Sequence, residues 1–268
     1  MLTTNKSFIE VSNLLKEKGI ENNEFMLVDD PSNIYDFLRE QLVIETIENK
    51  NVDFHINLLN LEAIYLLEQG FDVYISSPRQ SLGTTSILSY LRGKYEQNSN
   101  LKCSVITPSG TMDWYVAEKL YKTIKPTLSS KRMPLYKYND NNIKDFIFID
   151  DFEMMDKKLV NEIFKLLKYK RKYNWKTQFI FKSCVGRKGS LARMVANDII
   201  LSSYNFDYFL FDLDFSNYDK NKIVHVSTDI SDLYNKQTLE RMRNAINNDE
   251  SFKREILCDR TRKYYIEE

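Results

Sequence analysis

Short apolar runs alternate with longer amphipathic segments along most of the chain. The apolar runs are rich in β-branched and aromatic residues and lie at 71–76, 102–107, 145–150, 177–182 and 222–227. Segments with apolar residues at helical spacing lie between or after them, at 84–95, 111–124, 156–173, 190–203 and 236–257. Strands that alternate with helices indicate a mainly parallel central sheet flanked by helices on both faces. The pattern therefore predicts an α/β fold.

Helical patterns also precede the first predicted strand. Apolar residues recur at helical spacing over 5–18, a helix start signal opens 29–42, and the pattern over 60–70 ends in a glycine, which is typical of helix C-termini. The acidic, aromatic stretch 204–219 fits either an extra strand or a loop. We expect a helical N-terminal extension, a main α/β domain and a C-terminal helical linker or tail, over residues 1–50, 51–247 and 248–268 respectively.

Charge and composition exclude several classes of protein. Lys plus Arg and Asp plus Glu both number 38, so a chain-wide basic field for nucleic acid is excluded, although a local patch is not. The longest apolar runs are far short of a membrane span, and the amphipathic N-terminal segment contains acids, unlike signal and transit peptides. Three widely spaced cysteines and two histidines argue against a disulfide framework or a zinc site, and favour a reducing, cytosolic compartment.

The first candidate for chemistry is YISSPRQSLGTTSILSY, residues 74–90, where a predicted strand passes through a short loop into a predicted helix. A P-loop has this order and the pattern G-x-x-x-x-G-K-[ST], with a lysine for the phosphates and a hydroxyl for Mg²⁺. In one alignment Thr84 supplies the hydroxyl, Gly83 replaces the lysine and Ser77 replaces the first glycine. In the other, Thr85 supplies the hydroxyl and Thr84 replaces the lysine. Both alignments lack the lysine, and an ordinary strand–turn–helix junction is the alternative.

A second candidate lies at the end of the predicted strand 145–150. Its apolar residues are followed by Asp150 and Asp151, and Glu153 comes two residues later. Carboxylates at the C-terminal end of a central strand sit in the crevice where α/β sheets bind ligands. Asp150 suits the Mg²⁺ shell and Asp151 suits polarisation of water, with Glu153 able to substitute if the strand has ended. The alternative is a solvated acid pair at a strand end.

Together with their surroundings, these motifs resemble the ATPase half of the large terminase subunit of tailed phages, the DNA-packaging motor. The loop PRQSLGT at 78–84 is similar to the family's Pro-Arg-Gln-x-Gly-Lys-Thr, and FIDDFEMM at 148–155 is similar to its Asp-Glu-Phe-Glu strand end. The segments 33–41 and 53–80 resemble the family's helical approach to the nucleotide site. The resemblance implies a P-loop NTPase fold of the RecA/ASCE-like type.

The resemblance continues beyond the acid pair. FIFKSCVGRKGSL at 179–191 falls where the family has a Thr-Thr-Pro-Gly coupling motif, with Ser183 in a hydroxyl position and Val185 in place of the proline. NNDESFKREILCDR at 247–260 is similar to the segment that leads to the family's nuclease, and eight residues follow it. We therefore expect no nuclease domain. A packaging ATPase with a separate nuclease, an excised fragment and a paralogue that has lost the motor remain alternatives.

The resemblance implies that the chain binds ATP and Mg²⁺ and acts on double-stranded DNA in the host cytoplasm, as a homo-oligomeric ring or with a portal or nuclease partner. The implied nucleotide-binding residues are Arg79, Gln80, Ser81, Leu82, Gly83, Thr84 and Thr85, and the implied metal ligands are Thr84 and Asp150. The implied catalytic residues are Asp151 or Glu153 for water, Arg79 for sensing phosphate and Ser183 for coupling hydrolysis to motion. Because the phosphate-gripping lysine is missing, a non-enzymatic structural or assembly subunit is the alternative.

Basic residues gather in two further segments. KLLKYKRKYNWK at 165–176 interleaves basic and aromatic residues, which suits phosphate contact and base stacking, and RKGSLAR at 187–193 adds more positive charge. The candidate DNA contacts are Lys168, Lys170, Arg171, Lys172, Arg187 and Lys188. The alternative is a solvated helix face whose apolar side packs on the core.

Overall fold

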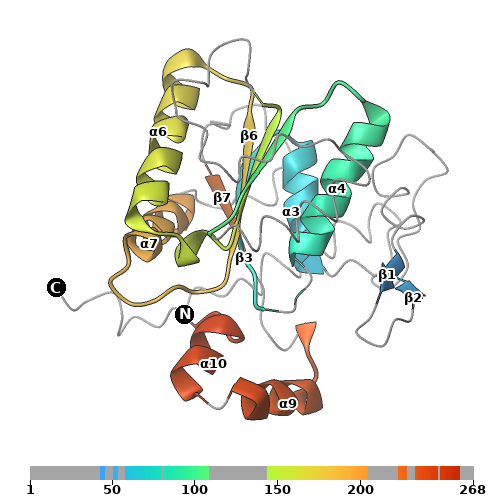
Figure 1. Ribbon diagram of the computed structural model, residues 1–268, viewed down its shortest axis with the longest axis vertical. Coiled ribbons are helices and arrows are strands. Elements are labelled where there is room, and N and C mark those ends of the chain that lie inside the picture. The colour runs from blue at the N-terminus through green and yellow to red at the C-terminus, as the bar shows by residue number, and fades with distance from the viewer. Residues whose placement is uncertain are drawn as a thin grey trace.

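A parallel sheet with helices on both faces confirms the α/β fold predicted from the hydrophobic pattern (Figure 1). The computed structural model describes residues 43–45, 51–53, 58–79, 81, 83–108, 144–204, 223–227, 233–246 and 248–259. The predicted helices 5–18, 29–42 and 111–124 lie outside these residues, as does the stretch 204–219 apart from its first residue.

The five strands of the sheet match the five predicted runs to within one residue at each end. They are β3 (Asp72–Ser76), β4 (Cys103–Ile106), β5 (Phe146–Asp150), β6 (Gln178–Ser183) and β7 (Ile223–Val226). Their order in the sheet is β4-β5-β6-β3-β7, and all four pairings are parallel. The strand that enters the loop, β3, is therefore separated from the strand that ends in the acid pair, β5, by β6 alone.

The helices also follow the predicted pattern, with one exception. They are α3 (Leu58–Glu68), α4 (Gly83–Gln97), α6 (Lys157–Tyr173), α7 (Leu191–Tyr204), α9 (Lys236–Ile246) and α10 (Asp249–Glu255), with a 3₁₀ turn, η3, at Phe152–Met154. The predicted single helix 236–257 is two helices, because the side chain of Asn248 accepts a hydrogen bond from Ser251 N at 2.9 Å and so caps a new helix start.

Two short strands precede α3 in the chain. β1 (Val43–Glu45) and β2 (Asn51–Asp53) pair antiparallel, and the pattern of the sequence did not predict them. Within the expected N-terminal extension, β1 is the part that the structure describes. In the described part of the chain, no helix is both long and apolar enough to cross a bilayer.

Two apolar layers hold the helices against the sheet. Leu59, Ile64, Ile87, Phe148 and Ile180 belong to the layer under α3 and α4, whereas Ile147, Phe179, Phe181, Ile163 and Ala196 belong to the layer under α6 and α7. Successive side chains of a strand point to opposite faces. Asp150 lies two residues beyond Phe148, and Lys182 lies two residues beyond Ile180. Both therefore share the face that α3 and α4 cover. Because the strands are parallel, their carboxyl ends, where α/β sheets bind ligands, all meet at one edge.

Candidate functional site

The loop between β3 and α4 is fixed by its neighbours at both ends. Ser77 N donates to Ser183 O at the end of β6 at 2.9 Å, and Asn60 Nδ2 on α3 donates to Ser81 O at 3.2 Å. The hydroxyls of Ser77 and Ser81 are hydrogen-bonded to each other across the loop. Both serines are buried. The remaining two residues of the expected nucleotide loop, Gln80 and Leu82, lie outside the described part of the chain.

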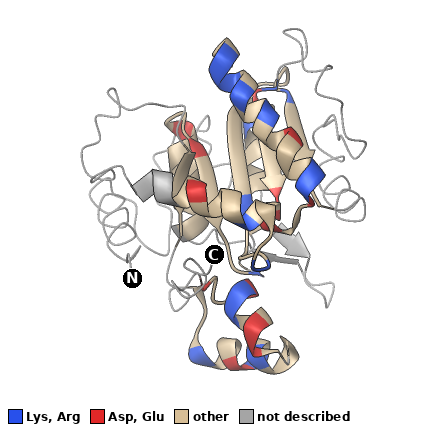
Figure 2. Cartoon of the chain, turned by 90° about the vertical axis from the view of Figure 1, so that its left-hand side faces the viewer, with Lys and Arg blue, Asp and Glu red and all other residues tan. Residues whose placement is uncertain are grey.

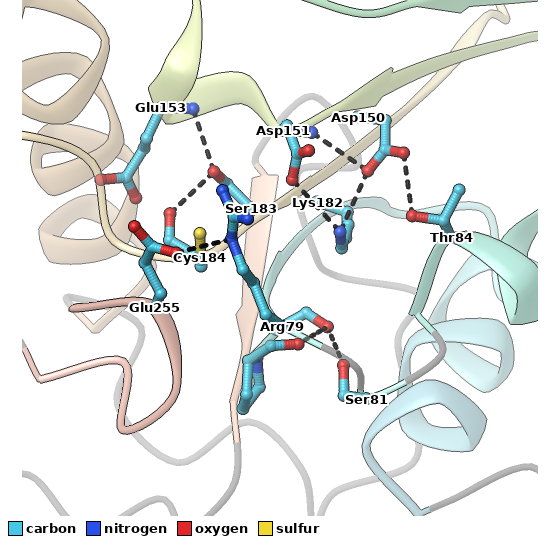
Figure 3. Close-up of polar contacts among 12 residues, drawn as sticks. Arg79, Ser81, Thr84, Asp150, Asp151, Glu153, Lys182, Ser183, Cys184 and Glu255 are labelled. Atoms are coloured by element: carbon cyan, nitrogen blue, oxygen red, sulfur yellow. Dashed lines mark hydrogen bonds and ion pairs between the residues drawn. The ribbon is translucent and has the colours of Figure 1, made fainter. Parts of the chain in front are cut away.

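The start of α4 is joined to the end of β5 by one hydrogen bond. Thr84 Oγ1 donates to Asp150 Oδ2 at 2.8 Å, across 66 positions of sequence (Figure 3). This contact favours the alignment in which Thr84 supplies the hydroxyl and Gly83 replaces the lysine over the alignment in which Thr85 supplies the hydroxyl. The first turn of α4 contains no acidic side chain. Its N–H groups therefore form a favourable environment for an anion.

The acid pair at the end of β5 consists of one buried and one partly exposed carboxylate. Asp150 is fully buried, whereas the side chain of Asp151 is 23% exposed. Asp151 has a left-handed backbone, with φ 51° and ψ 43°, and its N–H donates to Asp150 Oδ1 at 3.0 Å. Burial raises the pKa of Asp150 above its ordinary value, although Lys182 opposes this rise. Asp151 is the member of the pair that water reaches.

Lys182 is a site residue that the sequence reasoning missed. It stands opposite Asp150 in the β5–β6 register, and its Nζ lies 3.2 Å from Asp150 Oδ1 and 3.3 Å from Asp151 Oδ1. Burial alone would lower the pKa of Lys182, but the two carboxylates outweigh burial and raise it, so the ammonium stays charged. A lysine directly after the apolar residues FIF at 179–181, near the C-terminal end of a predicted strand, is the signal that could have identified it.

Arg79 is held by the C-terminal helix α10. Its Nε lies 2.8 Å from Glu255 Oε2, and its backbone N–H donates to Glu255 O at 2.8 Å. Burial lowers the pKa of Arg79, but Glu255, Cys184 and Asp151 together outweigh burial and raise it above its ordinary value. The side chain is 55% exposed, so it has room to change partner. The expected role of Arg79 in sensing phosphate stays a prediction that requires this ion pair to open.

Glu153 and Ser183 belong to a buried network on the α6 and α7 side of the sheet. The Glu153 carboxylate accepts from Tyr74 Oη at 2.6 Å and from Gly186 N at 2.7 Å, and the residue is 2% exposed. Ser183 Oγ accepts from Glu153 N at 3.0 Å and donates to Cys184 O at 2.7 Å. Because Asp150 faces the opposite layer, this network is separate from the Thr84 contact. The expected catalytic roles of Glu153 and Ser183 stay predictions.

The expected DNA contacts do not form one patch. Lys168, Arg171 and Lys172 are exposed near the C-terminal end of α6, where basic residues gather away from α9 and α10 (Figure 2). Arg187 and Lys188 are exposed just after β6. Because α6 leads into the amino end of β6, these two groups lie at opposite ends of that strand.

One expected DNA contact is wrong. Lys170 is 5% exposed, and its Nζ donates to both carboxylate oxygens of Asp72, at 2.6 and 2.7 Å. On α6 it lies among the positions that face the sheet, together with Val160, Ile163 and Leu166. The lysine neutralises a buried carboxylate of β3 and is not available to a phosphate backbone.

The side chains at the loop fit a magnesium–nucleotide complex better than a free metal ion. Mg²⁺ prefers oxygen ligands and is commonly bound through one or two carboxylates together with substrate phosphates and water. Thr84 and Asp150 supply a hydroxyl and a carboxylate of this kind. Among the described residues, no group of three or more His, Cys, Asp or Glu side chains could hold a metal ion by itself.

Comparison with known proteins supports the fold. The sequence matches no protein-family model, and no curated protein is similar to it. Among solved structures, the chain is similar to the large terminase ATPase domain of Thermus phage P74-26, with a TM-score of 0.53 and 10% identity over 78% of this chain and 94% of that one. It is also similar to the large terminase of a thermophilic bacteriophage, with a TM-score of 0.50 and 12% identity over 76% of this chain and 53% of that one. The chain therefore has a fold like that of a terminase ATPase domain, and the predicted resemblance is confirmed at the level of the fold.

Proposed function

We propose that the chain is a terminase-like packaging ATPase of a phage, which binds Mg·ATP and double-stranded DNA in the host cytoplasm. The observation that carries this proposal is the 2.8 Å hydrogen bond from Thr84 to Asp150. It joins the hydroxyl at the start of the loop helix to the acid at the end of the acid-pair strand, which is the pairing that Mg·nucleotide binding requires. The similarity of the fold to terminase ATPase domains supports the same proposal.

Each residue of the site has a task in this proposal. Thr84 and Asp150 hold Mg²⁺, which when bound neutralises negative charge on the phosphates. The N–H groups at the start of α4 bind phosphate oxygens, and Asp151 orients the attacking water from its partly exposed position. Arg79 turns to the phosphates once Glu255 releases it. In this proposal the chain acts as a homo-oligomeric ring or together with a portal or nuclease partner.

DNA-stimulated ATP hydrolysis tests the proposal. The purified full chain is assayed with Mg²⁺, with and without double-stranded DNA, beside Asp150→Ala and the surface control Glu240→Ala on α9. We expect turnover that DNA increases, that Asp150→Ala abolishes and that Glu240→Ala leaves unchanged. Turnover equal in the wild type and Asp150→Ala contradicts the proposal.

A non-enzymatic assembly subunit is the second candidate. The observation in its favour is that Lys182 already lies within 3.3 Å of both acids, while Glu255 holds Arg79. In that case the fold serves as a docking surface for a portal, a nuclease or DNA. Absence of Mg·ATP binding by a folded wild-type chain, together with DNA binding or capture on procapsids, supports this candidate over the ATPase.

A further inference from the structure

The space beside Gly83 is already filled by Ser77 and the stem of Lys182. Gly83 opens α4 and stands at the lysine position of the alignment that the Thr84 contact favours. A Cβ atom on Gly83 would lie 2.7 Å from Ser77 Oγ, a distance that real Cβ atoms essentially never show. The same atom would lie 3.4 Å from Lys182 Cε. The first atom of a side chain at this position therefore collides with Ser77 and touches the stem of Lys182.

The sheet order brings Lys182 to this space. β6 lies between the loop strand β3 and the acid-pair strand β5. Lys182 is the second-last residue of β6, and its side chain is 11% exposed. Its stem is covered by protein while its ammonium lies at the acid pair. The lysine therefore enters, from a neighbouring strand, the region that a loop lysine reaches from the start of the helix.

The charge balance at the acid pair favours a role for this lysine in binding phosphate. Asp150 and Asp151 are two carboxylates at one strand end, and Lys182 is the cation that forms ion pairs with both. Arg79, the basic residue of the loop itself, is engaged by Glu255. Among the described residues, Lys182 is the cation paired with these acids, so without it a triphosphate would face two carboxylates that no described cation neutralises, whereas phosphoryl transfer depends on fixed cations.

We propose that Lys182 replaces the missing P-loop lysine, so that the phosphate-binding cation of this site comes from β6 instead of from the loop. The inference rests on the proposed function, because it assigns the residue that contacts the phosphates of the bound nucleotide. The alternative is a simpler role, in which Lys182 only neutralises the acid pair and blocks the metal position.

Equilibrium binding of a fluorescent ATP analogue with Mg²⁺ distinguishes the two roles. The full chain is compared with Lys182→Gln, with Lys168→Gln as a surface control on α6. We expect Lys182→Gln to weaken binding at least about tenfold, which is about 1.4 kcal/mol, and the control to bind as the wild type does. Equal or tighter binding by Lys182→Gln, beside a wild type that binds, overturns this inference and leaves the proposed function standing.

A second variant moves the lysine back to the loop. Ser77→Gly, Gly83→Lys and Lys182→Thr are combined, which clears the space beside position 83 and restores the usual lysine position. We expect the combined variant to recover binding relative to Lys182→Gln. If it binds Mg·ATP while the wild type does not, Lys182 is no substitute and the inference is overturned. If neither binds, the proposed function fails as well.

Chemical labelling of the wild type covers the case in which Lys182→Gln does not fold. An acyl-phosphate derivative of ATP transfers its acyl group to a lysine amine beside the phosphates, forming an amide as the acyl–phosphate bond breaks and ATP leaves. Mass spectrometry then identifies the lysine. We expect ATP-competed labelling of Lys182. Labelling of other lysines with Lys182 unmodified overturns the inference.

Discussion

Replacement of Lys170 by methionine is expected to destabilise the fold and not to remove a DNA contact. Its Nζ lies 2.6 Å from Asp72 Oδ2, and the two side chains are 7% and 1% exposed. The other Asp72 oxygen also accepts from Phe179 N at 2.9 Å. Breaking a buried ion pair from one side costs about 3–5 kcal/mol, because the remaining charge is uncompensated. At about 2–4 °C per kcal/mol for a domain of this size, Tm should fall by roughly 6–20 °C.

Thermal denaturation at pH 7, followed by circular dichroism, measures this effect. Lys168→Met is the matched control, because Lys168 is exposed on the same helix and surface substitutions change stability by about 0.5 kcal/mol or less. The double variant Asp72→Asn, Lys170→Met should recover part of the lost stability, since it leaves no uncompensated charge. A Lys170→Met variant that has the same Tm as the Lys168→Met control but binds DNA more weakly would refute the reasoning.

Three further predictions concern buried or paired carboxylates. Burial raises the pKa of Glu62 from 4.5 to about 8, so its contribution to stability is full below pH 4.5 and is lost as pH rises through about 8. Between these pH values the free energy of unfolding should fall by about 1.4 kcal/mol per pH unit. Glu62→Gln should therefore remove the corresponding fall of Tm between pH 5 and 8.5. A Tm that falls equally with pH in the variant contradicts the assignment. Glu255→Gln should change stability by less than about 1 kcal/mol, because the ion pair is partly exposed, yet raise ATP turnover by releasing Arg79. If turnover by Glu255→Gln instead falls, as it should in Arg79→Ala, the ion pair is required for activity and the prediction is contradicted. Glu153→Gln should cost about 1.5–3 kcal/mol in urea denaturation, since its carboxylate accepts two hydrogen bonds in the interior. Unchanged stability with lost turnover would make Glu153 catalytic.

The elements of the fold could be predicted from the sequence because each one carries its own pattern. Buried parallel strands are continuous apolar runs, and FIFID and QFIFKS are recognisable without any partner. The split between α9 and α10 was not recognised, because a single Asn cap inside a helical pattern gives a weak signal. The pairing of β1 with β2 was missed because strands of three residues have no readable alternation.

The site could be predicted only in part, because its decisive contacts join segments that are distant in sequence. The loop and the acid pair were recognisable as motifs, but the choice between Thr84 and Thr85 required the contact with Asp150. The importance of Lys182 depends on β6 lying between two other strands, which is a property of the sheet order and not of the local sequence. Lys170 was misassigned because a basic run hides which of its members faces the core.

Calorimetric titration with Mg·ATP tests most directly the central claim, that the loop helix and the acid-pair strand form one nucleotide site. The full chain is compared with Thr84→Val, Asp150→Asn and the double variant. We expect saturable binding of one nucleotide per chain by the wild type and at least about tenfold weaker binding by each single variant. The double variant should be no weaker than the worse single variant, since both side chains act through one contact. Absence of binding by the folded wild type, or losses that add in the double variant, would contradict the account.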